Sequence, residues 1–301
     1  MKKVLRLIKS KKLFLPIYYI LNYVHRVIPD KIYLHIKYRY HMGKKLNLKQ
    51  PESFNEKLQW LKLYDRNPQY PLLVDKYAVR NYVKERIGEE HLVPLIGVYE
   101  KYEDINFELL PEQFVMKPNH TSGDIYFCKD IRSIDHIRLK KYINKWIKKN
   151  QFWYGREWPY KYIKPLILCE KYLINTSGEE LKDYKFLCFK GEVLCSFVCL
   201  NRFSPGGLNV DFYDIDWNLM PFERHYARSN TTIPKPYTYS KMIHYSEILS
   251  TGLPFARIDF YESDRRLFFS EITLYPGSGF EEFSPESYDY LLGNWLKIPI
   301  N

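Results

Sequence analysis

The sequence predicts a mixed α+β or α/β fold, because short apolar runs typical of strands alternate with longer amphipathic runs typical of helices. The chain has 301 residues, which is enough for one large core or two modest domains. Its 46% hydrophobic and 27% charged residues are the composition of a folded protein and not of a disordered one.

Helix signals are clear at several places. Ser53 and Glu56 form a capping box that opens a helix within Pro51–Tyr64. Leu72–Ile87 has the pattern of one amphipathic helix that ends at Gly88. Two further runs predict helices: Asp135–Asn150 and Lys241–Leu249.

Strand-like runs lie between these helices, and two longer stretches have the composition of loops. The loops are the aromatic stretch Phe152–Tyr162 and the Gly/Pro-containing excursion Phe203–Pro236. The predicted strands are Leu92–Val98, Gln113–Lys117, Pro165–Ile174, Lys185–Phe189 and Val193–Leu200.

The net charge of +11 is concentrated at the N-terminus, where residues 1–49 carry 13 Lys and Arg and one acid, Asp30. The apolar stretch Leu13–Ile28 is too short and too interrupted for a membrane span, and no small-residue cleavage site follows it. Basic residues interleaved with Leu, Ile and Tyr fit an interfacial helix on an anionic membrane. The alternative is a helix that packs on the protein body with its charges in solvent.

Two classes of site find no support in the sequence. It has no zinc-finger, RNP-like or helix-turn-helix signature, so we expect no nucleic-acid partner. The five cysteines form no C-x-x-C pair, which argues against a zinc site, and four of them lie in apolar runs. We therefore expect buried thiols in a reducing cytoplasm.

The segment Ala256–Gly279 carries the densest set of functional side chains. Two apolar runs flank a polar turn, Glu262–Arg266, and predict a hairpin. Because residues two apart share a strand face, Arg257 lies with Asp259, and Glu271 lies with Thr273. Oxygen ligands of this kind suit Mg²⁺ bridged to substrate phosphates. The alternative is an ordinary hairpin with a solvated charged face.

Charged residues elsewhere could join that hairpin. Lys117 ends a strand before the polar loop Asn119–Asp124, and a lysine beside such a loop can hold phosphate oxygens, although no P-loop is present. Glu170 lies in an apolar strand and must pair with a cation or reach a cleft. Asp183 and Lys185 share one strand face, and Asp75 is placed to cap a helix.

The order of these residues resembles the ATP-grasp superfamily and, within it, the TupA-like ATP-grasp family of polysaccharide biosynthesis. Five strings within residues 50–298 carry the resemblance: SFNEKLQWLKLYDRNP, VDKYAVRNYV, WYGREWPYKYIKP, DYKFLCFKGE and EITLYPGSGFEEF. The resemblance implies two α+β subdomains that clasp ATP. The implied regions are a basic helical segment at 1–50, a helical or α+β region at 51–110, a lid at 111–180 and a C-terminal subdomain at 181–301.

The resemblance also implies roles for single residues. Arg257 and Lys185 would act at the reacting phosphoryl group, and Asp259 and Glu271 would bind Mg²⁺. Thr273 replaces the superfamily's usual Asn as the third metal ligand, which puts the second metal position in doubt. The implied ATP-binding set, which covers the phosphates, the lid loop, adenine and ribose, is Lys76, Lys117, His120, Thr121, Ser122, Gly123, Glu170, Leu173, Glu180 (or its neighbour Glu179) and Lys185.

The activity that the resemblance implies is ATP-dependent ligation of a carboxylate to an amine through an acyl-phosphate. The acceptor would be a uronic-acid carboxylate of a surface glycan, free or lipid-linked, and the donor an amino acid or another amine. The enzyme would be cytoplasmic, with residues 1–49 held at the inner face of the membrane.

Two alternatives to a ligase stay open at this point. A glycosyltransferase would need an acidic metal motif, and the nearest string, Asp214-Ile215-Asp216, lacks the usual preceding apolar strand. A non-catalytic binding protein would not need the intact set Lys117, Lys185, Arg257, Asp259 and Glu271.

Overall fold

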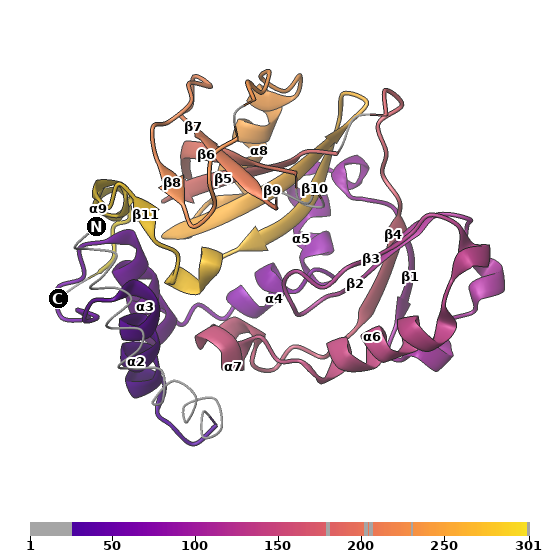
Figure 1. Ribbon diagram of the computed structural model, residues 1–301, viewed down its shortest axis with the longest axis horizontal. Coiled ribbons are helices and arrows are strands. Elements are labelled where there is room, and N and C mark those ends of the chain that lie inside the picture. The colour runs from indigo at the N-terminus through magenta and orange to yellow at the C-terminus, as the bar shows by residue number, and fades with distance from the viewer. Residues whose placement is uncertain (1–25, 179–180, 202–203, 205–206, 230, 300–301) are drawn as a thin grey trace.

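The computed structural model describes residues 26–178, 181–201, 204, 207–229 and 231–299. Two antiparallel sheets form two lobes that face each other, and helices cover their outer sides (Figure 1). The strand order is β10-β9-β5-β6-β7 in the larger sheet and β1-β4-β2-β3 in the smaller one. This architecture confirms the predicted α+β class.

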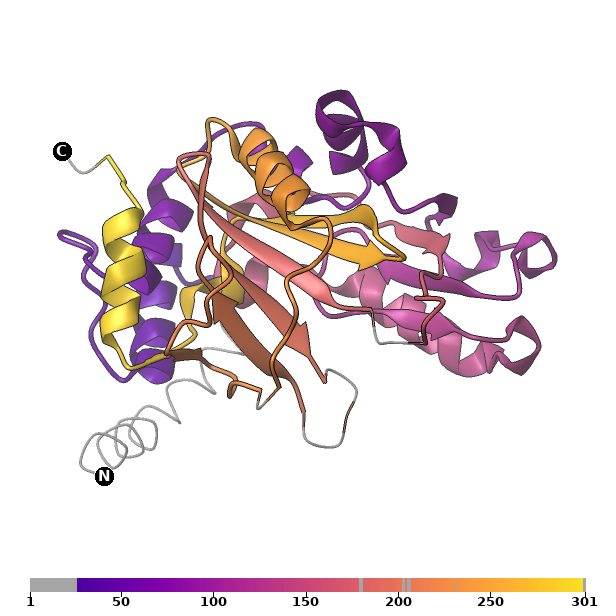
Figure 2. The same cartoon turned by 90° about the horizontal axis from the view of Figure 1, so that it is seen from above.

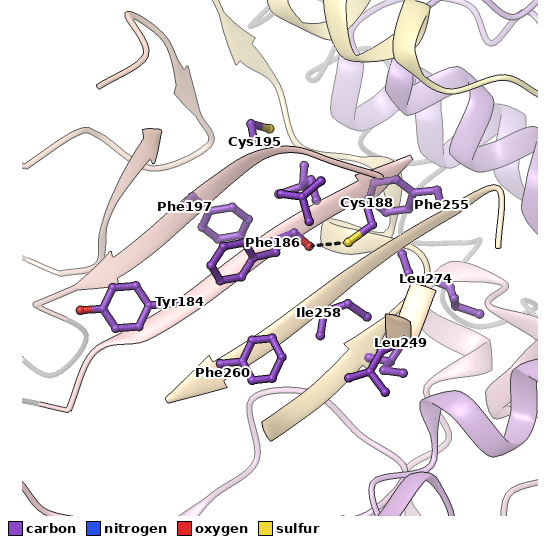
Figure 3. Packing of buried hydrophobic residues seen from close by; sticks show 14 of the residues in the cluster. Tyr184, Phe186, Cys188, Cys195, Phe197, Leu249, Phe255, Ile258, Phe260 and Leu274 are labelled. Carbon is purple, nitrogen blue, oxygen red and sulfur yellow. Dashed lines mark hydrogen bonds between the residues drawn. The ribbon is translucent and has the colours of Figure 1, made fainter. Parts of the chain in front are cut away.

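The larger sheet separates the hydrophobic core from a charged face. Its strands are β5 (Asp183–Phe189), β6 (Glu192–Leu200), β7 (Asn209–Tyr213), β9 (Phe255–Ser263) and β10 (Arg266–Thr273). Helix α8 (Tyr239–Ser250) packs against β5, β6 and β9. Figure 3 shows the buried residues between them, with Phe186, Cys188, Ile258 and Phe260 among those labelled. Since strand side chains alternate, Lys185, Arg257 and Asp259 project from the opposite face.

The smaller sheet has its own core beneath one helix. Strands β1 (Leu95–Tyr99), β2 (Phe114–Pro118), β3 (Tyr126–Cys128) and β4 (Ile167–Lys171) are covered by α6 (His136–Lys148). Phe114, Met116 and Cys169 pack with Leu139, Ile143 and Trp146 of α6. The view from above shows this lobe at one end of the molecule (Figure 2).

Helices at the other end close the larger lobe. They are α2 (Asp30–Met42), α3 (Phe54–Tyr64) and α9 (Ser287–Trp295), beside the short strands β8 (Glu223–Arg224) and β11 (Phe283–Ser284). The capping box of Ser53 and Glu56 is present at the start of α3. Tyr33, Leu34 and Tyr38 of α2 are buried in a cluster with Phe280, so this part of the basic segment packs on the protein body.

The other part of the basic segment, residues 1–25, lies outside the described residues. Within the described ranges, no helix has the length and the apolar character that a membrane crossing requires.

Three predicted segments differ from the structure. The helix expected over 72–87 is two helices, α4 (Tyr70–Val74) and α5 (Val79–Ile87). The break occurs at Asp75, whose Oδ1 accepts the N–H groups of Tyr77 and Ala78 and an amide N–H of Asn119. This long-range bond fixes Asp75 as a cap and not as part of a helix.

The other two differences are elements within predicted loops. The aromatic stretch contains α7 (Phe152–Gly155) and a 3₁₀ turn at Trp158–Tyr160, and the Gly/Pro excursion contains β7 and β8. The excursion has the composition of a loop, but β7 gains its hydrogen bonds from the edge of β6. The expected boundaries at residues 50, 110 and 180 stay predictions.

Gly293 tests how closely α9 packs on the start of α3. A Cβ at this position would lie 2.1 Å from the carbonyl oxygen of Glu52 and 2.9 Å from the backbone nitrogen of Phe54. We expect Gly293→Ala to lower the free energy of unfolding by about 1–3 kcal/mol, because the helices must move apart. Urea denaturation measures this, and Asn294→Ala, at the exposed neighbour, is the matched control. Equal stability of Gly293→Ala and wild type would contradict the close packing.

Candidate active site

The hairpin of β9 and β10 holds an ion network on one face. In its register, Asp259 lies opposite Glu271 and Arg257 lies opposite Thr273. The guanidinium of Arg257 donates to both oxygens of Asp259, each at 2.7 Å, to Glu271 at 2.8 Å and to the Thr273 hydroxyl at 2.9 Å. The Asp259 side chain is fully buried, so the alternative of a solvated charged face is wrong.

Lys185 completes the network from the neighbouring strand. It lies opposite Asp259 in the β5–β9 register, and its ammonium contacts that carboxylate and the Asp183 carboxylate, the latter at 2.7 Å. Burial opposes the positive charges, but Asp183 and Asp259 raise the pKa of Lys185, and Asp259 and Glu271 raise that of Arg257. Both cations therefore keep their charge at neutral pH.

Glu271 stays ionised for a related reason. Burial favours its neutral form, but Lys76 and Arg257 outweigh burial and hold the pKa of this carboxyl well below its usual range. The Lys76 ammonium lies 3.1 Å from Glu271 and donates to the carbonyl of Thr121 at 2.7 Å. Lys76 thus ties the hairpin of the larger sheet to the polar loop after β2.

The polar loop has an anchored part and an open part. His120 and Thr121 are buried; His120 contacts the carbonyl of Trp146, and Thr121 donates to Asp124. Ser122 and Gly123 instead line a cavity of about 500 Å³ between the lobes. The contacts of His120 and Thr121 therefore limit how far Ser122 and Gly123 can move.

Glu170 and Lys117 form an ion pair on the smaller sheet. They are 2.7 Å apart, and Arg80 lies 3.5 Å from the other oxygen of Glu170. Burial disfavours the ammonium of Lys117, but Glu170, together with Tyr261 and Glu271, outweighs burial and raises the pKa of Lys117. Glu170 is therefore paired with cations, as a carboxylate in an apolar strand must be.

Two neighbouring cavities collect most of the expected residues. The cavity of about 500 Å³ and a second one of about 550 Å³ share as lining residues Lys117, Ile125, Asp183, Cys199 and Tyr261. Lys76, Lys117, Ser122, Gly123, Lys185, Arg257 and Glu271 line the first, and Lys117, Glu170 and Leu173 line the second. His120, Thr121, Asp259 and Thr273 line neither cavity. Glu179 and Glu180 lie outside the described residues.

The residues present fit a magnesium ion through hard oxygen donors. The oxygens of Glu271 contact Arg257 and Lys76, and those of Asp259 contact Arg257 and Lys185. Of these two carboxylates, Glu271 is the one that lines the first cavity. In the part of the chain that is described, no three His, Cys, Asp or Glu side chains are grouped to hold a metal. Of the three candidate ligands, Glu271 thus lines the first cavity, and Asp259 and Thr273 do not.

A buried cluster beneath the turn Pro276–Gly279 was missed by sequence reasoning. The Lys62 ammonium donates to the carbonyls of Gly155 and Ser278 at 2.7 and 2.8 Å, and the Ser278 hydroxyl donates to Glu157 at 2.8 Å. Lys62 is 1% exposed, and its burial lowers the pKa to about 7. Lys62 and Glu157 belong to the strings that carry the resemblance, but their spacing gives no sign that they meet.

Comparison with known proteins identifies the family of this chain. A model of the family TupA-like ATPgrasp matches residues 56–297. The fold is thus the ATP-grasp fold, with the two sheets as its two lobes. Since the match covers most of the sequence, the chain belongs to the TupA-like ATP-grasp family. No curated protein matches the sequence.

Solved structures of ligases are distantly similar. D-Alanine–D-alanine ligase from Bacillus anthracis complexed with ATP is 15% identical over 75% of this chain and 63% of that chain, with a TM-score of 0.41. The Helicobacter pylori ligase of the same name is 13% identical over 83% and 68%, with a TM-score of 0.44. The ATP-grasp ligase PsnB with minimal precursor, Mg and ADP is 10% identical over 81% and 66%, with a TM-score of 0.39.

The family assignment does not depend on these likenesses, because all three TM-scores are below 0.5. The chain spans less than two thirds of the Bacillus anthracis ligase that it matches.

The depressed pKa of Lys62 predicts a pH-dependent stability. The folded chain releases the proton near pH 7, whereas the unfolded chain keeps it until about 10.5. The unfolded state therefore binds more protons between these values, and the free energy of unfolding rises with pH there. From pH 7 to 9, wild type should gain on the order of 2 kcal/mol relative to Lys62→Met, at about 1.4 kcal/mol per pH unit.

Urea denaturation at the two pH values measures the difference. Lys37, whose pKa is also lowered to about 7, is present in both proteins and contributes to both pH profiles. Lys49→Met, at an exposed lysine, is the control and should follow wild type. Parallel pH profiles of wild type and Lys62→Met would contradict the lowered pKa of Lys62.

Proposed function

We propose that this protein is an ATP-dependent carboxylate–amine ligase that acts through an acyl-phosphate. One observation carries the proposal: Arg257 contacts both Asp259 and Glu271 at a cavity that Lys76, Lys117 and Lys185 also line. This arrangement is suited to transfer of a phosphoryl group, whose negative charge must be offset at fixed positions.

The two cavities suggest how ATP would be bound. Three lysines supply the positive charge that a triphosphate needs, and the open loop at Ser122 and Gly123 can cover it. The second cavity, with Glu170 and Leu173 in its wall, is suited to adenine. Glu180 as a ribose ligand stays a prediction.

The protein's own residues would supply a preorganised electrostatic environment. Arg257 is held by four hydrogen bonds and Lys185 by two carboxylates, so neither cation needs to reorient during transfer. Glu271 would hold Mg²⁺ at the cavity, and Asp259 and Thr273 are the further candidate ligands. When bound, the metal would offset charge on the transferring phosphoryl group.

The substrates are proposed from the family. We infer that the acceptor is a uronic-acid carboxylate of a cell-surface polysaccharide or its lipid-linked precursor, and that an amino acid or another amine is joined to it. The cytoplasm would be the place of reaction. Residues 1–25 hold six Lys and Arg and no acid, which favours contact with an anionic membrane.

One assay tests the activity. The purified protein would be incubated with Mg-ATP, candidate uronic acids and amino acids, and release of ADP and phosphate would be measured. Release that depends on both acid and amine supports the ligase. UDP release from a nucleotide sugar without ATP consumption would instead identify a glycosyltransferase.

Glu271→Gln should lower turnover at least a hundredfold, because an amide lacks the charge that balances Mg²⁺ and Arg257. Glu192→Gln, at an exposed residue of the same sheet, should keep wild-type turnover. Circular dichroism would verify that both variants are folded. Wild-type rates in Glu271→Gln would refute the metal assignment.

A truncation tests the membrane proposal. Because α2 belongs to a buried cluster, the deletion must stop at residue 25. We expect the shortened protein to lose most of its binding to liposomes that contain anionic lipid, with no change for neutral liposomes. Sedimentation of the liposomes gives the bound fraction, and equal binding of the two proteins would refute the membrane contact.

A further inference from the structure

The first cavity extends beyond the region that ATP would occupy. Its far wall is formed by β6, β7, β8 and the turn after β10. Apolar side chains line part of this wall, among them Leu208, Val210 and Phe212. Two charged residues, Arg224 and Glu281, line it as well.

Arg224 is an unusually buried cation for a cavity wall. It is 3% exposed, and its Nη2 donates to the carbonyl of Pro276 at 2.9 Å. Its Nε has no hydrogen-bond partner among the residues that the structure describes. Burial lowers the pKa of Arg224, the Glu281 carboxylate raises it, and the nearby charge of Arg257 lowers it. A guanidinium carries several N–H donors, so the bond to Pro276 leaves capacity for a further acceptor.

Glu281 provides a nearby opposite charge. Its carboxylate lies 3.3 Å from Nε of Arg224 without hydrogen-bond geometry, and its side chain is 25% exposed. It packs over Gly277, where a Cβ would lie 2.1 Å from the Glu281 carboxyl carbon. Gly277 thus leaves room for Glu281 beside the cavity.

We propose that Arg224 and Glu281 bind the amine donor and that this donor is an α-amino acid with a free carboxylate. Arg224 would take the carboxylate, because a guanidinium matches its planar geometry. Glu281 would take the ammonium group. An α-amino acid carries its two charges close together, as this pair does, whereas Glu281 would repel a simple anion. The proposal rests on the ligase function and names the class of one substrate.

Equilibrium dialysis tests this site without requiring turnover. The full chain, with Mg²⁺ and a non-hydrolysable ATP analogue, would be dialysed against a radiolabelled mixture of the twenty protein amino acids. We expect wild type to retain label that the unlabelled amino acids displace, whereas the corresponding amino-acid amides, which lack the carboxylate, do not displace it. Arg224→Gln and Glu281→Gln should each reduce retention at least tenfold, and Arg224→Lys should restore part of it.

Controls separate the possible failures. Arg132→Gln, at an exposed arginine, should retain label like wild type. Binding of the ATP analogue should be unchanged in all variants, which shows that they are folded; if Arg224→Gln does not fold, the more exposed Glu281→Gln decides. Three results would overturn the proposal. They are the absence of retained label in wild type, displacement of the label by the amides, and full retention in Glu281→Gln. Retention without ADP release in the assay above would support this site and reject the ligase.

Discussion

The pairing of Arg257 with Asp259 is the interaction on which the site depends. A fully buried carboxylate is tolerated only when it is paired, and here a guanidinium and the ammonium of Lys185 pair it from two neighbouring strands. Loss of one partner from such a group costs about 3–5 kcal/mol, because a buried charge is left uncompensated. The same contacts that keep the carboxylate buried therefore hold both cations at the cavity.

Because side chains alternate along a strand, one face of the larger sheet forms the core and the other face carries the charged residues of the cavity. In β5, Phe186 and Cys188 contact α8 on the core side of the sheet, and Figure 3 labels both among the buried residues. Asp183 and Lys185 of the same strand line the cavity. A shift of register by one residue would exchange the two faces and expose the core. The hydrophobic core thus specifies the register that brings Lys185 opposite Asp259.

Local patterns made part of this structure predictable. The hairpin follows from the period of two in β9 and β10, and the start of α3 follows from its capping box. The break after α4 was not predictable, because Asp75 is fixed by Asn119, which is 44 residues away. Lys62 and Arg224 were missed for a similar reason: a basic residue in an amphipathic helix or in a loop is usually solvated, and only the fold shows that these two are buried.

The turn Pro276–Gly279 packs closely against α7 and against α3, which limits how this chain can vary in sequence. A Cβ on Gly155 would lie 1.7 Å from the hydroxyl oxygen of Ser278, and one on Gly279 would lie 2.4 Å from the side-chain nitrogen of Gln59. The turn and the two helices, each more than a hundred residues away from it in sequence, are therefore closely fitted, and none of them accepts a larger side chain at these glycines alone. Replacements here must arise in combination, and a library designed to alter this protein should diversify the turn and the two helices jointly.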